Sequence, residues 1–259
     1  MKKLLLILLT IPSLALANSG GNDESTLSTS ALHPKQVKWE FDSIFGRFDR
    51  ASARRGYQVY REVCSACHSL KLVSYRNLGE LGFGEDEIKQ IASEALVADG
   101  PNDDGEMFER AGLPSDKFAS PYTNEQAARA SNGGAYPPDL SLMIKARHDG
   151  ANYVYSILTG YSEAPEGFEL ASGKQYHPYF EGRQISMPQP LTDDGQVEYK
   201  DGTYATKEQM ALDVVNFLQW AAEPETEARK KMGVRTMIFL GILFVILLAA
   251  KRAVWKKVK

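Results

Sequence analysis

The chain contains the pentapeptide Cys64-Ser65-Ala66-Cys67-His68, and the rest of its sequence can be interpreted around this stretch. Two thiols three positions apart, with a histidine directly after the second, form the attachment signal for a c-type haem. Each thiol adds to one vinyl group of the porphyrin, and the histidine then lies where its imidazole can bind the iron. The motif therefore predicts one covalent haem c, held by Cys64, Cys67 and His68.

Two other interpretations of the cysteine pair are weaker. A zinc site needs further Cys or His residues at metal-ligand spacing, and the 259 residues contain only these 2 cysteines. A redox-active pair of the thioredoxin type is expected near a βαβ pattern, which this sequence does not show.

Residues 1–17 have the form of a bacterial secretory signal peptide. The basic start Met1-Lys2-Lys3 is followed by an apolar run at 4–16 and by the Ala-x-Ala site Ala15-Leu16-Ala17. The apolar run is too short for a membrane helix, which is the alternative. We predict removal of residues 1–17 and export of the remainder, in agreement with thioether attachment outside the bacterial cytoplasmic membrane.

Residues 232–250 are almost wholly apolar, interrupted only by Arg235 and Thr236. At about 1.5 Å per residue they span roughly 28 Å, close to the hydrocarbon thickness of a bilayer. Trp255 and a basic tail at 251–259 follow. We predict a single transmembrane anchor at 232–250, a cytoplasmic tail at 251–259 and a periplasmic domain at 18–231, on the inner membrane. A buried core helix is the alternative.

The net charge of −3 hides an asymmetry between the ends and the body of the chain. All 33 acidic residues lie in 18–231, whereas 8 of the 30 basic residues lie in the signal peptide or from Arg235 onward, which leaves the body at −11. An acidic exported domain does not favour nucleic-acid binding. It suits long-range attraction of a basic soluble partner.

The predicted fold class is mostly α, a class I-like cytochrome c fold with long irregular loops. We expect helices at 49–67, 85–97, 140–147, 152–158 and 206–222. Irregular chain is expected at 99–132, with a helical turn at 125–130, and at 163–201, with a hairpin around Gly195 and Gly202. Gly56, within the first helix, predicts the close crossing of another helix. Thr206 and Gln209 predict a capping box.

The iron also needs a second axial ligand or an open position. The candidates outside the signal peptide and the anchor are Met107, Met143, Met187, Met210, His33, His148 and His177. Met187 lies in an irregular stretch that Pro188 stiffens, and a loop can direct a thioether at the iron. From the residues alone, Met187 as the second axial ligand is not distinguished from the alternative, in which the methionines only fill space in the core.

Several motifs, in order, show that the chain resembles the cytochrome c1 family, the haem-bearing subunit of the bc1 complex. They are residues 55–69, Tyr75-Arg76-Asn77-Leu78, residues 132–141, Lys145-Ala146-Arg147-His148, Leu158-Thr159-Gly160-Tyr161 and residues 177–188. The resemblance implies that Met187 is the sixth ligand, that Arg147 and Tyr153 reach a haem propionate, and that Pro137 and Pro138 line the haem edge. Some bacterial members carry an extra disulfide, which this chain cannot form.

The resemblance implies electron transfer within a membrane quinol–cytochrome c oxidoreductase. Its partners would be cytochrome b, a Rieske iron–sulfur protein as donor and a c-type cytochrome as acceptor. An acidic loop, formed by Asp99, Asp103, Asp104, Glu106 and Glu109, could meet a basic partner, or be merely solvated. Two other functions remain open: a peroxidase-like haem enzyme with an open axial site, and a membrane-anchored shuttle that acts without bc1 partners.

Overall fold

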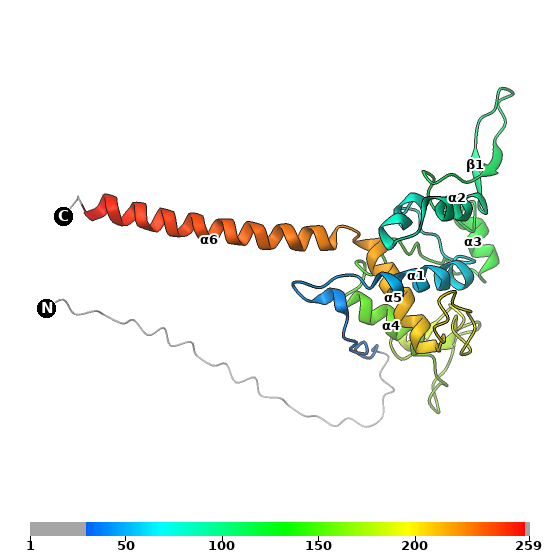
Figure 1. The fold of residues 1–259 in the computed structure, drawn as a ribbon. Helices are drawn as coiled ribbons and strands as arrows, with labels where there is room; N and C mark the ends of the chain where they lie inside the picture. The colour runs from blue at the N-terminus through cyan, green and yellow to red at the C-terminus, as the bar shows by residue number, and fades with distance from the viewer. Residues whose placement is uncertain (1–29, 257–259) are drawn as a thin grey trace.

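A computed structural model describes residues 30–256, which form a helical head and one long projecting helix (Figure 1). The α-helices are α1 Arg50–Val59, α2 Glu85–Ser93, α3 Glu125–Ser131, α4 Gly150–Thr159, α5 Lys207–Ala222 and α6 Thr226–Lys256. Short 3-10 helices lie at Glu40–Asp42, Tyr75–Leu81 and Glu181–Arg183, and one π-helical turn at Tyr60–Cys64. The strands are β1 Leu96–Asp99, β2 Phe108–Ala111, β3 Gln175–Tyr176 and β4 Gln184–Ile185. The predicted mostly helical class is confirmed.

The head is built on the crossing of α1 and α5. At Gly56 a Cβ atom would overlap the backbone carbonyl of Asp213 and lie 2.8 Å from the Cβ of Phe217. Only a glycine therefore allows the two helices to approach this closely, which confirms the reason predicted for Gly56. Asp49 caps α1 by accepting a hydrogen bond from the Ser52 amide at 3.1 Å.

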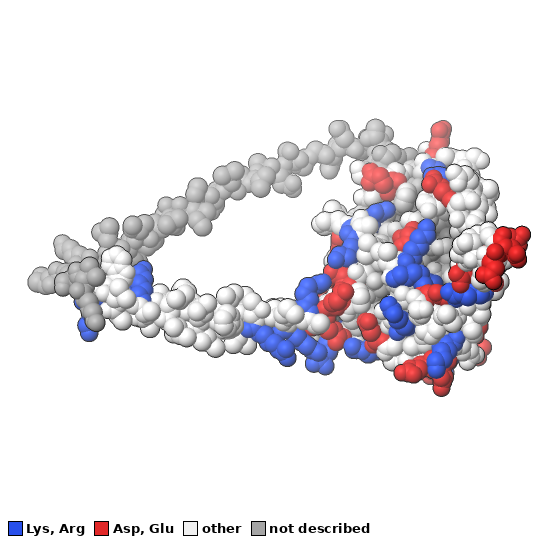
Figure 2. Space-filling model, turned by 90° about the horizontal axis from the view of Figure 1, so that it is seen from above, with Lys and Arg blue, Asp and Glu red and all other residues white. Residues whose placement is uncertain are grey.

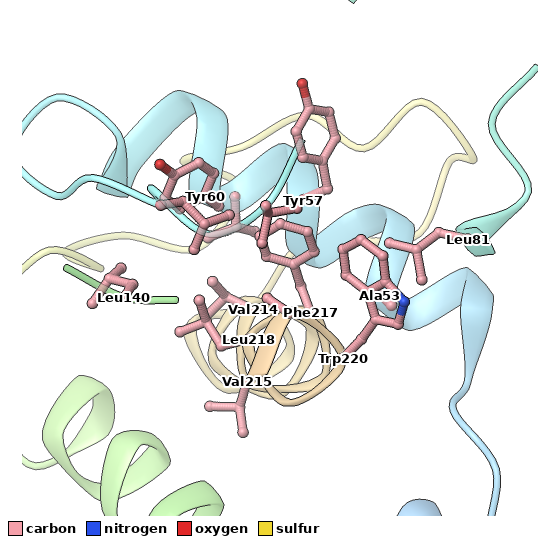
Figure 3. Packing of buried hydrophobic residues seen from close by; sticks show 14 of the residues in the cluster. Ala53, Tyr57, Tyr60, Leu81, Leu140, Val214, Val215, Phe217, Leu218 and Trp220 are labelled. Carbon is pink, nitrogen blue, oxygen red and sulfur yellow. The ribbon is translucent and has the colours of Figure 1, made fainter. Parts of the chain in front are cut away.

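The apolar faces of these two helices form the centre of the core (Figure 3). Phe217 on α5 packs against Tyr57 of α1 and against Tyr60, the first residue of the π-helical turn, with ring centroids 5.7 Å apart in both pairs. Such tilted and edge-to-face pairs stabilise a core beyond the burial of their area. The residues leading to Cys64 are thereby fixed against the last helix of the head.

One buried carboxylate lies in the same crossing. The side chain of Asp213 is fully buried and accepts hydrogen bonds from Ser52 Oγ at 2.6 Å and from Arg55 Nε at 2.9 Å. Gln209 Nε2 also donates to Asp213, at 3.0 Å. The predicted capping box is therefore half formed: Thr206 Oγ1 accepts from the Gln209 amide at 3.0 Å, while the Gln209 side chain turns to Asp213. A buried charge with this many partners is satisfied.

Three predictions of secondary structure were wrong. The helix expected at 85–97 ends at Ser93, because the chain leaves it to form β1, which pairs with β2 in an antiparallel hairpin. Residues 140–147 form consecutive turns instead of a helix. No strand forms around Gly195 and Gly202; in the described part of 163–201 the strands are β3 and β4. The helical turn expected at 125–130 is confirmed as α3.

The predicted anchor lies within α6, a helix of 31 residues that leaves the head as a rod (Figure 1). At about 1.5 Å per residue it is roughly 46 Å long, enough to cross the hydrocarbon layer and extend beyond it. Its most apolar window has a mean hydropathy of 2.3 and is 0% buried inside the head. A core helix would be covered, so α6 is not one. The predicted signal peptide, 1–17, lies outside the described residues.

Candidate haem site

The two cysteines lie where α1 ends. At Tyr60 the helix widens into one π-helical turn, closed by the bond from the Ser65 amide to the Tyr60 carbonyl at 2.8 Å. The chain then turns back on Cys64, whose carbonyl accepts the amides of Cys67 at 3.1 Å and His68 at 2.9 Å. Both thiols are free. Single π-helical turns often mark functional sites, and this one presents two thiols and an imidazole from one tight turn.

The imidazole of His68 is held in one tautomer. Its Nδ1 lies 2.8 Å from the carbonyl oxygen of Pro138. A carbonyl oxygen only accepts, so Nδ1 carries the proton and Nε2 keeps its lone pair. Burial lowers the pKa of His68, and this outweighs the opposite effects of the Pro138 carbonyl and of Asp139. At neutral pH the ring is therefore uncharged, which is the form that binds a metal.

The Pro137–Pro138 loop is fixed by a residue that the sequence analysis did not single out. Asp139 Oδ2 accepts from Ser69 Oγ at 2.7 Å and from the Lys71 amide at 2.9 Å, and its Oδ1 accepts from the Ser141 amide at 2.9 Å. Burial acts to raise the pKa of Asp139, but these hydrogen bonds outweigh it and hold the pKa below the ordinary value. The pattern Asp-x-Ser after a proline pair is typical of an Asx turn and could have indicated this role.

Met187 lies just after β4, in a bend that α4 holds in place. The Tyr161 hydroxyl donates to the Met187 carbonyl at 3.0 Å. The Tyr161 ring meets His177 edge-on, with centroids 4.7 Å apart, and His177 Nε2 donates to the Ile157 carbonyl at 2.9 Å. The Met187 side chain is half-buried. Within the described chain, no hydrogen bond joins this group directly to His68 or Pro138.

Arg147 and Tyr153, which the resemblance links to a haem propionate, lie near each other. The guanidinium of Arg147 is 6.0 Å from the centroid of the Tyr153 ring, which is carried by α4. Arg147 is exposed, and its Nη1 donates to the Ala146 carbonyl at 3.0 Å. None of the ion pairs between described residues includes Arg147, so its charge is available to an anionic group.

The other candidate iron ligands have different surroundings. Met210 is fully buried within α5, and Met107 is 68% exposed between the strands of the β1–β2 hairpin. Met143 packs against the core, and His148 and His33 are exposed. His177 already uses Nε2, although its buried Nδ1 has no partner. Across residues 30–256 no three His, Cys, Asp or Glu side chains cluster as metal ligands, which disfavours the zinc interpretation.

Comparison with known sequences identifies the family. The sequence profile described as "Cytochrome C1 family" matches residues 39–258. The chain belongs to this family. It is 48% identical to "Cytochrome c1" of Rhodospirillum rubrum over 98% of this chain and 95% of the relative. It is 47% identical to "Cytochrome c1, heme protein, mitochondrial" of Saccharomyces cerevisiae, over 94% of this chain and 79% of the relative. A Candida albicans relative, 47% identical over 97% of this chain and 87% of its own length, is named "Cytochrome b-c1 complex catalytic subunit, mitochondrial".

Membership in the cytochrome c1 family confirms the predicted covalent haem c, and the geometry of this chain fits that cofactor. Two unpaired thiols are available for thioether bonds, and the adjacent imidazole is neutral with a free Nε2. An unpaired cation, Arg147, lies beside an aromatic ring on α4. Two thiols and an imidazole with a free ring nitrogen are the groups that a c-type haem needs for its two vinyl groups and its iron.

Proposed function

We propose that this chain is the haem-bearing electron-transfer subunit of a membrane quinol–cytochrome c oxidoreductase of the bc1 type. Cys64 and Cys67 would hold the porphyrin through thioether bonds, and His68 and Met187 would bind the iron. The observation that carries the proposal is the bond between His68 Nδ1 and the Pro138 carbonyl, because it presets Nε2 as an iron ligand next to the two thiols. The name of the Candida albicans relative supports the assignment to a bc1 complex.

When bound, the haem supplies a one-electron couple between ferric and ferrous iron. The chain sets the potential and the access. By accepting the Nδ1 proton, the Pro138 carbonyl makes Nε2 of His68 a more basic ligand for the iron. The Met187 thioether raises the potential relative to a second imidazole. Arg147 and Tyr153 would hold a propionate, and Pro137 and Pro138 would cover the haem edge through which electrons pass. No side chain needs to make or break a bond.

The proposed partners are cytochrome b, a Rieske iron–sulfur protein as donor and a c-type cytochrome as acceptor. An acidic surface supports the last of these. The loop between β1 and β2 carries Asp103, Asp104 and Glu106, whereas Asp99 is paired with Arg110 at 2.5 Å. Figure 2 shows acidic side chains gathered on the side of the head remote from α6. A basic acceptor would be attracted to this surface before docking.

Charge removal tests the acidic surface. The triple variant Asp103→Asn/Asp104→Asn/Glu106→Gln should reduce a basic cytochrome c several-fold more slowly at low salt and with a flatter dependence on ionic strength. The matched control removes three exposed acidic charges elsewhere, Glu163→Gln/Glu166→Gln/Glu169→Gln, and should change the rate less. A wild-type rate that does not respond to salt would contradict an electrostatic docking role.

We place the head on the periplasmic face of the inner membrane. The support is the predicted signal peptide at 1–17, the five basic residues of the 251–259 tail and the length of α6. In this arrangement residues 18–231 face the periplasm, 232–250 cross the membrane and 251–259 face the cytoplasm. A protease added to sealed spheroplasts should digest the head and leave an epitope placed after Lys259 protected.

Replacement of Met187 tests the proposed axial pair. In Met187→Leu the iron should lose its sixth ligand, so the potential should fall and carbon monoxide should bind the reduced protein. In Met187→His the iron should stay six-coordinate, but with a lower potential. The control Met107→Leu, in the exposed hairpin loop, should leave the spectrum and the titration unchanged. A Met187→Leu protein with the wild-type spectrum would exclude Met187 as the ligand.

The two alternatives are distinguished on the unmodified protein. A peroxidase-like enzyme with an open axial site would bind carbon monoxide when reduced, whereas the proposed carrier should not. A free membrane-anchored shuttle would purify in mild detergent without a cytochrome b and an iron–sulfur protein, whereas the proposed subunit should retain both.

A further inference from the structure

A second apolar surface lies beside the start of α6. The loop formed by residues 43–47 carries Ile44, which is 72% exposed, and Phe45, which is 78% exposed. Both line a surface cleft of about 230 Å³ together with residues of the first turns of α6, including Val234 and Arg235. Isolated exposed apolar residues are ordinary. Ile44 and Phe45, however, are adjacent to each other and to Val234 of α6, near the start of its apolar run. They therefore extend the apolar surface of the helix that we propose spans the membrane.

The loop is held rigidly in this position. The Gly46 amide donates to the Ser43 carbonyl at 2.9 Å, and a Cβ at Gly46 would overlap the Glu40 carbonyl. Lys230 of α6 donates from Nζ to the carbonyl of Ser43 at 2.8 Å and also to that of Phe41. In Figure 1 this loop is the blue segment that extends from the head toward the α6 side. Ile44 and Phe45 are therefore fixed beside α6.

The same cleft is lined by basic side chains. Arg47, Lys231 and Arg235 line it, and Figure 2 shows Lys and Arg gathered where α6 leaves the head. None of the ion pairs between described residues includes Arg47 or Arg235. The one carboxylate in the cleft, Glu227, already binds Arg50 at 3.1 Å, and that bond helps to lower the pKa of Glu227 although burial acts to raise it. A cationic cleft above two apolar side chains matches the phosphate and acyl region of a phospholipid.

We propose that residues 43–47 are a second membrane contact of this chain. Ile44 and Phe45 enter the interfacial layer of the bilayer, and Arg47 and Arg235 bind the phosphate of an anionic lipid. The inference rests on the proposed transmembrane role of α6. Together with α6, this contact fixes the head at two points, so that its tilt relative to the membrane is set. With one transmembrane helix alone, the helix can tilt in the bilayer and the head tilts with it.

Nitroxide depth measurements on the full-length, haem-loaded chain in lipid nanodiscs test the proposal. The label is attached at Phe45→Cys, with Tyr204→Cys as the control, because Tyr204 is 69% exposed and lies beyond the other end of α5. Ile242→Cys, within α6, reports on the span itself. Relaxation by oxygen, which concentrates in hydrocarbon, is compared with relaxation by a water-soluble nickel chelate. Each is measured as the change from the same oxidised sample without relaxant, so that the contribution of the iron is subtracted.

We expect the oxygen-to-nickel ratio at 45 to exceed that at 204 several-fold and to be higher in nanodiscs containing phosphatidylglycerol than in pure phosphatidylcholine. Arg47→Gln/Arg235→Gln should remove that dependence on lipid charge. A ratio at 45 equal to that at 204, with 242 still in hydrocarbon, overturns the second contact and leaves the span intact. A polar environment at 242 overturns the span instead. If 45 is shielded from both relaxants only when cytochrome b is present, the loop contacts protein, and the lipid proposal is wrong.

Discussion

The orientation of the His68 ring depends on Asp139. The two residues are distant in sequence, but the loop at 138–141 packs against residues 68–71. The Pro138 carbonyl that fixes the His68 ring belongs to the residue directly before Asp139, and the Leu140 amide donates to the Ser69 carbonyl at 2.9 Å. The three hydrogen bonds accepted by Asp139 therefore hold both sides of the loop. A ligand can be predicted from five letters of sequence, whereas the carboxylate that positions its support is recognised only once the fold brings 68–71 and 138–141 together.

Asp139→Asn should destabilise the head by about 2 kcal/mol, because hydrogen bonds to a charged group contribute roughly 1.5–3 kcal/mol. The folded-state pKa of Asp139 lies below the ordinary value of 3.8, so its ionised form stabilises the fold above that pH. This stabilisation is lost as the pH falls through the folded pKa. Urea unfolding should therefore separate wild type from the variant at pH 7, and less so as the pH falls below 3.8.

The control for that measurement is Asp86→Asn. The Asp86 side chain is 99% exposed and pairs with Lys89 one helical turn away, so its removal should change the free energy of unfolding by less than about 0.5 kcal/mol. If both variants lose the same free energy of unfolding, the hydrogen bonds accepted by Asp139 do not stabilise the loop at 138–141.

Tyr161 supports the other proposed ligand. Tyr161→Phe removes the hydroxyl that donates to the Met187 carbonyl at 3.0 Å but keeps the ring against His177. The loss of one such hydrogen bond costs about 1 kcal/mol. Because this bond positions Met187, we expect its loss to weaken the bond between the iron and the Met187 sulfur. The measurement is the near-infrared charge-transfer band of the ferric protein, together with carbon monoxide binding. Tyr204→Phe, at an exposed position, should change neither.

At the scale of elements, helices with a clear apolar face and a cap were predictable. The start of α1 after Asp49 and the extent of α5, between Thr206 and Pro224, agree with their sequence signals. The end of α2 was not predictable, because a tertiary contact decides it: the Gly112 amide donates to the Ala95 carbonyl at 2.9 Å, which draws the chain into the β1–β2 hairpin. The strands of that hairpin are largely exposed, so they lack the alternating apolar pattern of a half-buried strand.

The α1–α5 crossing gives a prediction at this scale. Gly56→Ala places a methyl group against the Asp213 carbonyl, so the helices must move apart, at a cost of about 1–3 kcal/mol or more. Because the motif at 64–68 follows α1 directly, the yield of haem-loaded protein should fall together with the melting temperature. Gly79→Ala is the matched control, because its Cβ would meet only Ile88 Cδ1 at 3.7 Å, an ordinary contact. A Gly56→Ala protein as stable as this control would mean that the helices can separate freely.

The whole molecule consists of a head with a hydrophobic core of its own and a helix, α6, that contributes no residue to that core. The core residues lie between Trp39 and Ala222, and the apolar window of α6 is 0% buried. The junction is polar: Glu223 pairs with Lys145 at 2.9 Å and with Arg229 at 3.2 Å, and Glu227 pairs with Arg50. A long apolar helix able to span a membrane was predictable from hydropathy alone, whereas these ion pairs depend on segments that are distant in sequence.

A chain that ends after Lys231 keeps Glu223, Glu227 and Arg229 and lacks the apolar run. Since α6 buries none of its apolar window in the head, we expect this truncated protein to be soluble without detergent. Its free energy of unfolding should agree with that of the full chain in detergent to within about 1 kcal/mol, because no core contact is removed. Its reduced spectrum should be unchanged and its potential nearly so, measured by redox titration. A truncated protein that aggregates, or that loses haem during purification, would show that α6 supports the fold of the head.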